Sequence, residues 1–282
     1  MKRPWAPFFV VWYCCDVVRD VLKRCEIPLA GRSVLEIGCG GGSMLFRLCR
    51  DVRQITGLDV SNSTIEFLRE HYAGWYPNVE LIARDIGDFD AREKYDLVIS
   101  NDCFEHVADQ ESFLANAARC LKPGGTLCLQ FPNQPTHGVR HHRNLGALRR
   151  LVEPEFAPAR YFAVEPSWWH RALHGMFSWL RGKASARYER IRRAVLDDPE
   201  THGLDDFSRS ACFSYMREEV AGGLKYKIAR AVNGAFRVLD RVPPRHRLVE
   251  LTHLENDQPI LELRLVVLAS RKDRDAGGEV GI

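Results

Sequence analysis

The sequence predicts an α/β protein built on a mostly parallel β-sheet. From Ser33 onward, short apolar runs typical of buried strands alternate with segments whose apolar residues recur at helical spacing. A glycine-rich loop follows the first of these strands, and polar residues stand at the ends of the next three. Strands that alternate with helices favour parallel pairing with right-handed crossovers. We therefore expect one large α/β domain, with any ligand bound at the carboxyl edge of its sheet.

The individual elements follow from local patterns. Apolar runs predict five strands in the first half of the chain, at residues 33–38, 54–60, 79–85, 95–102 and 126–131. Ser63 and Glu66 form a capping-box pattern ahead of one helix, and Asp109 is placed to cap another. A further helix is predicted at 144–153. Two later strands are predicted at 159–164 ("ARYFAV") and 260–270 ("ILELRLVVLAS").

The chain is expected to divide into a core, an insertion, a returning strand and a tail. Residues 1–165 are predicted to form the core. The apolar run at their N-terminus breaks at Asp16, which is too early for a membrane span, so we predict a helix packed on the domain. Residues 166–258 lack clear β alternation and are predicted to be a helical insertion, a substrate lid or docking surface. Residues 259–270 would return as the final core strand, and 271–282 would be a disordered tail.

Composition narrows the class of protein. The net charge of +3 does not demand a partner made mostly of phosphates. The nine cysteines are irregularly spaced and form no C-x-x-C pair, which argues against a structural zinc site or a disulfide framework. Several stand in apolar runs, as Cys128 does, where a reduced thiol behaves as a small core residue. This usage predicts a cytoplasmic protein and no bound metal.

The glycine loop indicates what kind of ligand lies against it. Residues 38–43 read G-x-G-x-x-S, so Ser43 replaces the third glycine of the dinucleotide-binding fingerprint. Glu36 stands two residues before Gly38, and a carboxylate there would repel a pyrophosphate. The same carboxylate suits a ligand that carries an ammonium or a sulfonium. A cationic nucleoside fits this loop better than a dinucleotide.

Polar residues also end the next three predicted strands. Asp59 ends the second strand, at a distance from the loop where an acid can accept hydrogen bonds from both ribose hydroxyls. Asp85 ends the third strand, where its carboxylate can accept from an exocyclic adenine amine. Asn101 and Asp102 end the fourth. Because carboxyl ends of parallel strands meet at one edge of the sheet, these groups are expected to surround one ligand.

Five segments in this order resemble the successive motifs of class I S-adenosylmethionine-dependent methyltransferases. They are "VLEIGCGGG", "GLDVS", "ARDIGDF", "YDLVISNDCFEHVAD" and "LKPGGTLCLQFPN". The resemblance covers roughly residues 30–165 and the strand at 260–270. It implies a Rossmann-like, seven-stranded, mostly parallel sheet with an antiparallel last strand, plus the helical insertion. It also implies S-adenosyl-L-methionine as cofactor and S-adenosyl-L-homocysteine as product.

The resemblance assigns roles to individual residues. Glu36, Gly38 and Gly40 would face the methionine part of the cofactor, Asp59 would bind the ribose, and Asp85 with Ile86 would hold the adenine. Asn101 and Phe104 would line the methyl donor. The complete expected cofactor-binding set is Glu36, Gly38, Cys39, Gly40, Asp59, Val60, Asp85, Ile86, Asn101 and Phe104.

Methyl transfer from a sulfonium needs positioning, and an oxygen or nitrogen acceptor also needs a base. His106, with Glu105, is the preferred candidate because the pair follows the fourth strand. The expected substrate-binding residues are His137, His141, His142 and Trp168. The histidine cluster "HGVRHHR" lacks a fixed carboxylate or cysteine partner, so no metal site is predicted there.

The sequence therefore predicts a cytoplasmic methyltransferase acting on a small or lipid-like acceptor, with oxygen preferred as the methylated atom. The alternatives are an RNA or protein methyltransferase, a NAD-dependent oxidoreductase, and a non-catalytic nucleoside-binding module. Nucleic acid is disfavoured as a partner because neither an Asn-Pro-Pro-aromatic motif nor a Pro-Cys nucleophile is found in the chain. The insertion stretch "SWWHRALHGMFSWLRGK" combines a Trp-rich apolar face with basic flanks, so peripheral membrane contact stays open. The sequence does not indicate the oligomeric state.

Overall fold

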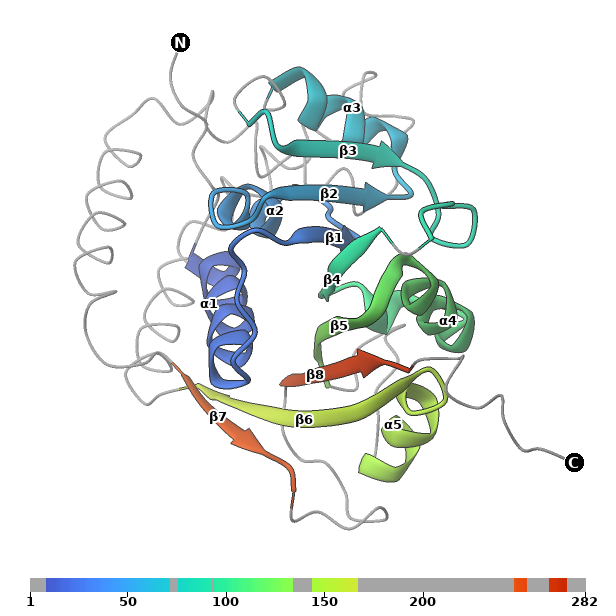
Figure 1. The fold of residues 1–282 in the computed structure, drawn as a ribbon. Coiled ribbons are helices and arrows are strands. Elements are labelled where there is room, and N and C mark those ends of the chain that lie inside the picture. The colour runs from blue at the N-terminus through green and yellow to red at the C-terminus, as the bar shows by residue number, and fades with distance from the viewer. Residues whose placement is uncertain are drawn as a thin grey trace, which may run out of the picture.

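A computed structural model describes residues 9–71, 76–92, 94–133, 144–166, 246–252 and 264–272. Its centre is one eight-stranded sheet with the strand order β3-β2-β1-β4-β5-β8-β6-β7 (Figure 1). The strands are β1 Ser33–Ile37, β2 Gln54–Asp59, β3 Val79–Ala83, β4 Tyr95–Asn101, β5 Leu121–Pro132, β6 Phe156–Pro166, β7 His246–Glu250 and β8 Arg264–Arg271. The helices are α1 Phe9–Arg24, α2 Ser43–Leu48, α3 Asn62–His71, α4 Gln110–Cys120 and α5 Leu145–Val152, with a 3₁₀ turn, η2, at Phe104–His106.

The sheet is parallel in its first half and antiparallel at its far side. Strands β3, β2, β1, β4 and β5 pair in parallel, as the alternation of strands and helices predicts. β8 runs antiparallel to both β5 and β6, so the α/β class and the antiparallel returning strand are confirmed. The structure describes this strand from Arg264 to Arg271, so Arg271 belongs to the strand and not to the predicted tail of 271–282. Residues 253–263 and 273–282 lie outside the described residues.

The expected strand count was wrong by one. β7 pairs antiparallel with β6 at the edge of the sheet, within residues 166–258, which the sequence predicted to be helical. Its segment "HRLVE" is only partly buried, because it has a neighbouring strand on one side alone. Such a short edge strand leaves little alternation in the sequence. Residues 167–245 of the predicted insertion lie outside the described part of the chain.

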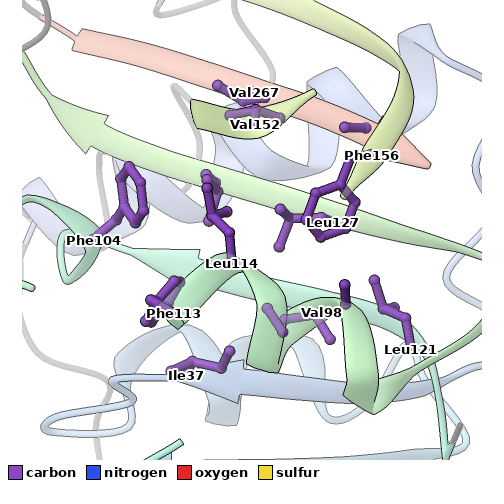
Figure 2. Packing of buried hydrophobic residues seen from close by; sticks show 14 of the residues in the cluster. Ile37, Val98, Phe104, Phe113, Leu114, Leu121, Leu127, Val152, Phe156 and Val267 are labelled. Atoms are coloured by element: carbon purple, nitrogen blue, oxygen red, sulfur yellow. The ribbon is translucent and has the colours of Figure 1, made fainter. Parts of the chain in front are cut away.

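Helices cover both faces of the sheet. On one face, α1 and α2 pack together, and buried residues of α1, α2 and α3 form one apolar cluster with strand residues such as Val34 and Ile99. On the other face, α4 and α5 bury Phe113, Leu114 and Val152 against Leu127 and neighbouring strand residues (Figure 2). Successive strand residues therefore point into opposite cores, which explains why the central strands read as continuous apolar runs.

The predicted start of α4 is confirmed. Asp109 directly precedes the helix, and its carboxylate accepts from the Ser112 backbone N–H at 3.0 Å and from the Ser112 hydroxyl at 2.7 Å. The first of these bonds satisfies one of the N–H groups that the first turn of a helix leaves without an intrahelical partner. None of the described helices combines the length and the hydropathy that crossing a membrane would require.

The predicted capping box of α3 was wrong. The helix begins at Asn62, so Ser63 lies inside its first turn. The residue in the capping position is Ser61, whose hydroxyl accepts from the Thr64 backbone N–H at 3.3 Å. Glu66, the other half of the predicted box, accepts from the side-chain amide of Asn62 at 2.7 Å. The helix therefore starts earlier than the box pattern indicates.

Candidate functional site

The carboxyl ends of the parallel strands bring the predicted acids together. β1 lies between β2 and β4, and Ile37 at its end pairs with Leu58 of β2 and Ser100 of β4. The loop after β1 folds over the end of β2, because the Gly38 and Cys39 N–H groups both donate to the Leu58 carbonyl, at 2.8 and 3.1 Å. This edge of the sheet is therefore the candidate site.

Glycine is required at the first position of the loop for two reasons. Gly38 has a φ of +73°, a conformation that residues with a Cβ rarely adopt. A Cβ added there would lie 2.3 Å from the Cys103 Sγ, well inside van der Waals contact. The loop backbone and the residue after β4 are thus packed directly against each other. Burial raises the pKa of Cys103 to about 12, so its thiol stays protonated and serves as a packing group.

Glu36 is a buried carboxyl at the mouth of this loop. Its side chain is almost fully buried, and burial, followed by the charge of Asp59, raises its pKa to about 8. Its Oε2 has no hydrogen-bond partner in the described part of the structure. A buried oxygen without a donor is costly unless a ligand supplies one. The position therefore fits a cationic donor such as an ammonium group.

Asp59 holds the loop and the end of β2 together. Its Oδ2 accepts from the Gly40 N–H at 2.8 Å, and its Oδ1 accepts from the Ser61 N–H at 3.0 Å. These bonds fix the carboxylate at the edge where the sequence expects a ribose. A carboxylate oxygen can accept more than one hydrogen bond, so both oxygens can also accept from ligand hydroxyls.

The expected adenine region lies beyond β2 and β3. Val60 is 70% exposed next to Asp59, which leaves an apolar surface for a flat ring. Asp85 is exposed, and its Oδ1 accepts from the Gly87 N–H at 2.7 Å, while Ile86 is buried. Val60, Asp85 and Ile86 follow adjacent strands, so the structure places them at the same edge of the sheet as the glycine loop.

The segment after β4 carries the expected methyl-donor and catalytic residues. Asn101 is half-buried, and its amide donates to the Asp102 carboxylate at 3.4 Å. The Phe104 ring is fully buried and lies 5.5 Å from both the Phe113 and Phe131 rings (Figure 2 shows its place beside Phe113). The ring therefore belongs to the core, and the expectation that it lines the methyl donor does not fit this placement.

Glu105 and His106 form a pair with unequal exposure. The Glu105 side chain is 2% exposed and the His106 side chain 57%, and Glu105 Oε1 lies 3.8 Å from His106 Nε2. Burial raises the pKa of Glu105 to about 7, and its Oε2 has no hydrogen-bond partner among the described residues. A buried carboxyl behind an exposed imidazole is an arrangement that can accept a proton near neutral pH.

Sequence reasoning missed Arg264 at this edge. Arg264 opens β8 opposite Pro132 of β5, and its guanidinium forms an ion pair with Asp102, just after β4. The signal was the two charged residues, Glu262 and Arg264, within the apolar run "ILELRLVVLAS". The expected substrate residues His137, His141, His142 and Trp168 lie outside the described residues. Within the described part of the chain, no group of three His, Cys, Asp or Glu side chains could hold a metal ion.

Part of this chain is similar in sequence to known methyltransferases. Residues 34–125 match a family model described as a methyltransferase domain. Ubiquinone biosynthesis O-methyltransferase of Nitrobacter winogradskyi is 34% identical over 106 residues, which cover 38% of this chain and 41% of that protein. The enzyme of the same name from Coxiella burnetii is 34% identical over 111 residues, which cover 39% of this chain and 47% of that protein. The match thus spans less than half the length of these curated relatives.

Solved structures show the same fold. A protein from Galdieria sulphuraria described as a sarcosine dimethylglycine methyltransferase has a TM-score of 0.52 at 15% identity, covering 92% of this chain and 85% of that one. An S-adenosylmethionine-dependent methyltransferase from Thermotoga maritima has a TM-score of 0.50 at 13% identity, covering 94% and 90%. At these identities the likeness shows the fold alone.

Proposed function

We propose that this chain, whose residues 34–125 match a methyltransferase domain, is a class I S-adenosylmethionine-dependent methyltransferase that transfers a methyl group to an oxygen of a small or lipid-like acceptor. The observation that carries the proposal is the buried Oε2 of Glu36, which has no hydrogen-bond partner among the residues that the structure describes and lies near the anchored carboxylate of Asp59. The Glu36 oxygen can accept from a cationic donor, and the Asp59 carboxylate is positioned for hydroxyls. A nucleoside that carries an amino-acid ammonium supplies both.

The residues present fit that cofactor. When bound, S-adenosylmethionine supplies an electrophilic methyl group on a sulfonium, and S-adenosylhomocysteine is the product. Glu36 would accept from the ammonium, and this contact would favour its ionised form. Asp59 would accept from the ribose hydroxyls while holding the Gly40 N–H. The exposed Val60 would lie against the adenine.

The proton of the acceptor goes to the pair after β4. His106 is exposed at the site edge, so its imidazole can take a proton from an acceptor hydroxyl while the oxygen attacks the methyl group. Glu105, 3.8 Å behind it, would stabilise the resulting imidazolium. Oxygen is favoured as the methylated atom because relatives about one-third identical are named O-methyltransferases.

Calorimetry tests cofactor binding. S-adenosylhomocysteine should bind the wild type, and NAD should not, because Glu36 would face its pyrophosphate. Asp59→Ala removes charge-assisted hydrogen bonds worth roughly 1.5–3 kcal/mol, so affinity should fall about tenfold to a hundredfold. Asp59→Asn, which keeps the size of the side chain, should change the affinity in the same direction. Tight NAD binding would instead support an oxidoreductase.

Methyl transfer is tested with soluble probes. With labelled S-adenosylmethionine, 3,4-dihydroxybenzoate tests an oxygen acceptor and a primary amine tests a nitrogen acceptor. We expect transfer to the catechol, and His106→Gln should lower kcat while the Kd for S-adenosylhomocysteine stays near wild type. Tight S-adenosylhomocysteine binding without transfer to any small molecule would favour a nucleoside-binding module or a macromolecular substrate. The predicted lid and membrane contact of residues 166–258 concern mostly residues outside the described ranges and remain predictions.

A further inference from the structure

An ion pair joins the start of the last strand to the end of β4. Arg264 and Asp102 are 162 residues apart in the chain, yet the Arg264 Nη1 donates to the Asp102 Oδ1. Both side chains are partly buried, at 20% and 36% exposure. Because β8 runs antiparallel to β5, its first residue lies at the same edge as the end of β4. The pair therefore lies at the same edge of the sheet as the turn that carries Glu105 and His106.

Asp102 is the residue that turns the chain out of β4. Its φ is +51°, in the left-handed region that non-glycine residues seldom occupy. Its N–H donates to the Gln130 carbonyl of β5 at 2.9 Å, and its carboxylate is held by Arg264. Three residues later, the same turn carries Glu105. Moving Asp102 would therefore move Glu105 and His106.

Opposite charges also act on Glu105 from these two residues. The groups that face it are Asp102 after β4, Arg264 of β8, its neighbour His106 and the protonated thiol of Cys103. After burial, which is the largest effect, the charge of Asp102 raises the pKa of Glu105 and the charge of Arg264 lowers it. Replacing Arg264 with a neutral residue would remove the charge that lowers the pKa of Glu105, and replacing Asp102 with a neutral residue would remove the charge that raises it.

We propose that Arg264 is a positioning residue for methyl transfer: through Asp102 it holds the turn that carries Glu105 and His106, and it keeps this pair able to accept a proton. The inference rests on the proposed function, in which the pair takes the acceptor proton. It adds a residue of the last strand to the machinery after β4. Arg264 acts through Asp102 and need not contact the acceptor.

The test is the titration of Glu105 by ¹³C NMR with carboxyl-labelled glutamate, using Glu105→Gln to assign the resonance. In the wild type the midpoint is expected at about pH 7. Arg264→Met should move the midpoint up and Asp102→Asn should move it down, each on the order of half a pH unit. Arg264→Lys, which keeps the charge, should lie near the wild type. A purely structural role predicts no such opposite movement.

Lys122→Met is the matched control. It breaks the Lys122–Asp96 ion pair, which joins β5 to the start of β4 at the opposite edge of the sheet, and should leave the Glu105 midpoint unchanged. Equal midpoints in wild type, Arg264→Met and Asp102→Asn would overturn the proposal. If Arg264→Met does not fold, an unmoved midpoint in Asp102→Asn is sufficient to overturn it.

Turnover provides the second readout. If the catechol probe is methylated, the rising limb of the kcat–pH profile should move in the same directions as the NMR midpoints. Calorimetry should show S-adenosylhomocysteine affinity near wild type in both variants. If the wild type transfers no methyl group, the proposed function would be contradicted. The NMR titrations would still decide whether Arg264 controls the charge of the Glu105–His106 pair. If the Glu105 midpoints move in opposite directions in the two variants but the kcat–pH profiles do not change, the proposed role of Arg264 in catalysis would be overturned.

Discussion

Replacing Glu36 with Gln should stabilise the protein while weakening cofactor binding. The pKa of Glu36 is raised from 4.5 to about 8, chiefly by burial. Between these two pH values the folded state binds more protons than the unfolded state, so the unfolding free energy of the wild type falls as pH rises. A pKa difference of one corresponds to about 1.4 kcal/mol, so the raised pKa of Glu36 lowers the unfolding free energy of the wild type by up to roughly 5 kcal/mol above pH 8. The Gln variant lacks this loss because its side chain is always neutral.

The assay is urea unfolding at pH 5, 7 and 9, followed by circular dichroism. The stability advantage of Glu36→Gln should be small at pH 5, grow through pH 7 and level off above pH 8. Glu111→Gln, on the exposed first turn of α4, is the control and should show no comparable growth. Calorimetry at pH 8 should show weaker S-adenosylhomocysteine binding by Glu36→Gln. A stability difference that is constant with pH would refute the reasoning.

Two further substitutions distinguish a residue of the candidate cofactor site from a residue of the hydrophobic core. Gly38→Ala should abolish measurable S-adenosylhomocysteine binding, because its Cβ would overlap the Cys103 Sγ. Gly31→Ala is the control for backbone strain, since Gly31 has a similar φ of +75° but no atom within 4 Å of an added Cβ. Equal losses of binding in the two variants, measured by calorimetry, would contradict this explanation. Phe104→Ala should lower the unfolding free energy in urea by about 3–5 kcal/mol, since the ring is fully buried. A loss below about 1 kcal/mol would show that the ring is not a core group.

The central strands could be predicted because each carries its own signal. β1, β2 and β4 are buried on both faces, so their sequences are mostly apolar, and β2 and β4 end at the polar residues Asp59 and Asn101. β7 gave no such signal, because its pairing depends on β6, from which residues 167–245 separate it in the chain. The cap of α3 was misplaced by two residues because Ser61 and Ser63 offer the same side-chain chemistry.

The sequence predicted where the residues of the candidate site lie in the sheet, but not which side chains they contact. Glu36 and Asp59 lie near the ends of neighbouring strands, so the sheet alone places them at one edge. Local sequence does not show which way the chain turns after β4, and that turn sends the Phe104 ring into the core. Nor does it show the Arg264–Asp102 ion pair, which depends on the antiparallel return of β8.

A crystal structure with S-adenosylhomocysteine tests the central claim most directly. We expect the ribose hydroxyls within hydrogen-bond distance of the Asp59 carboxylate, the amino group facing Glu36, and the adenine beside Val60. The thioether sulfur should face the turn at Glu105 and His106. Density for the ligand at any other edge of the sheet, or an anionic part of the ligand against Glu36, would contradict the account.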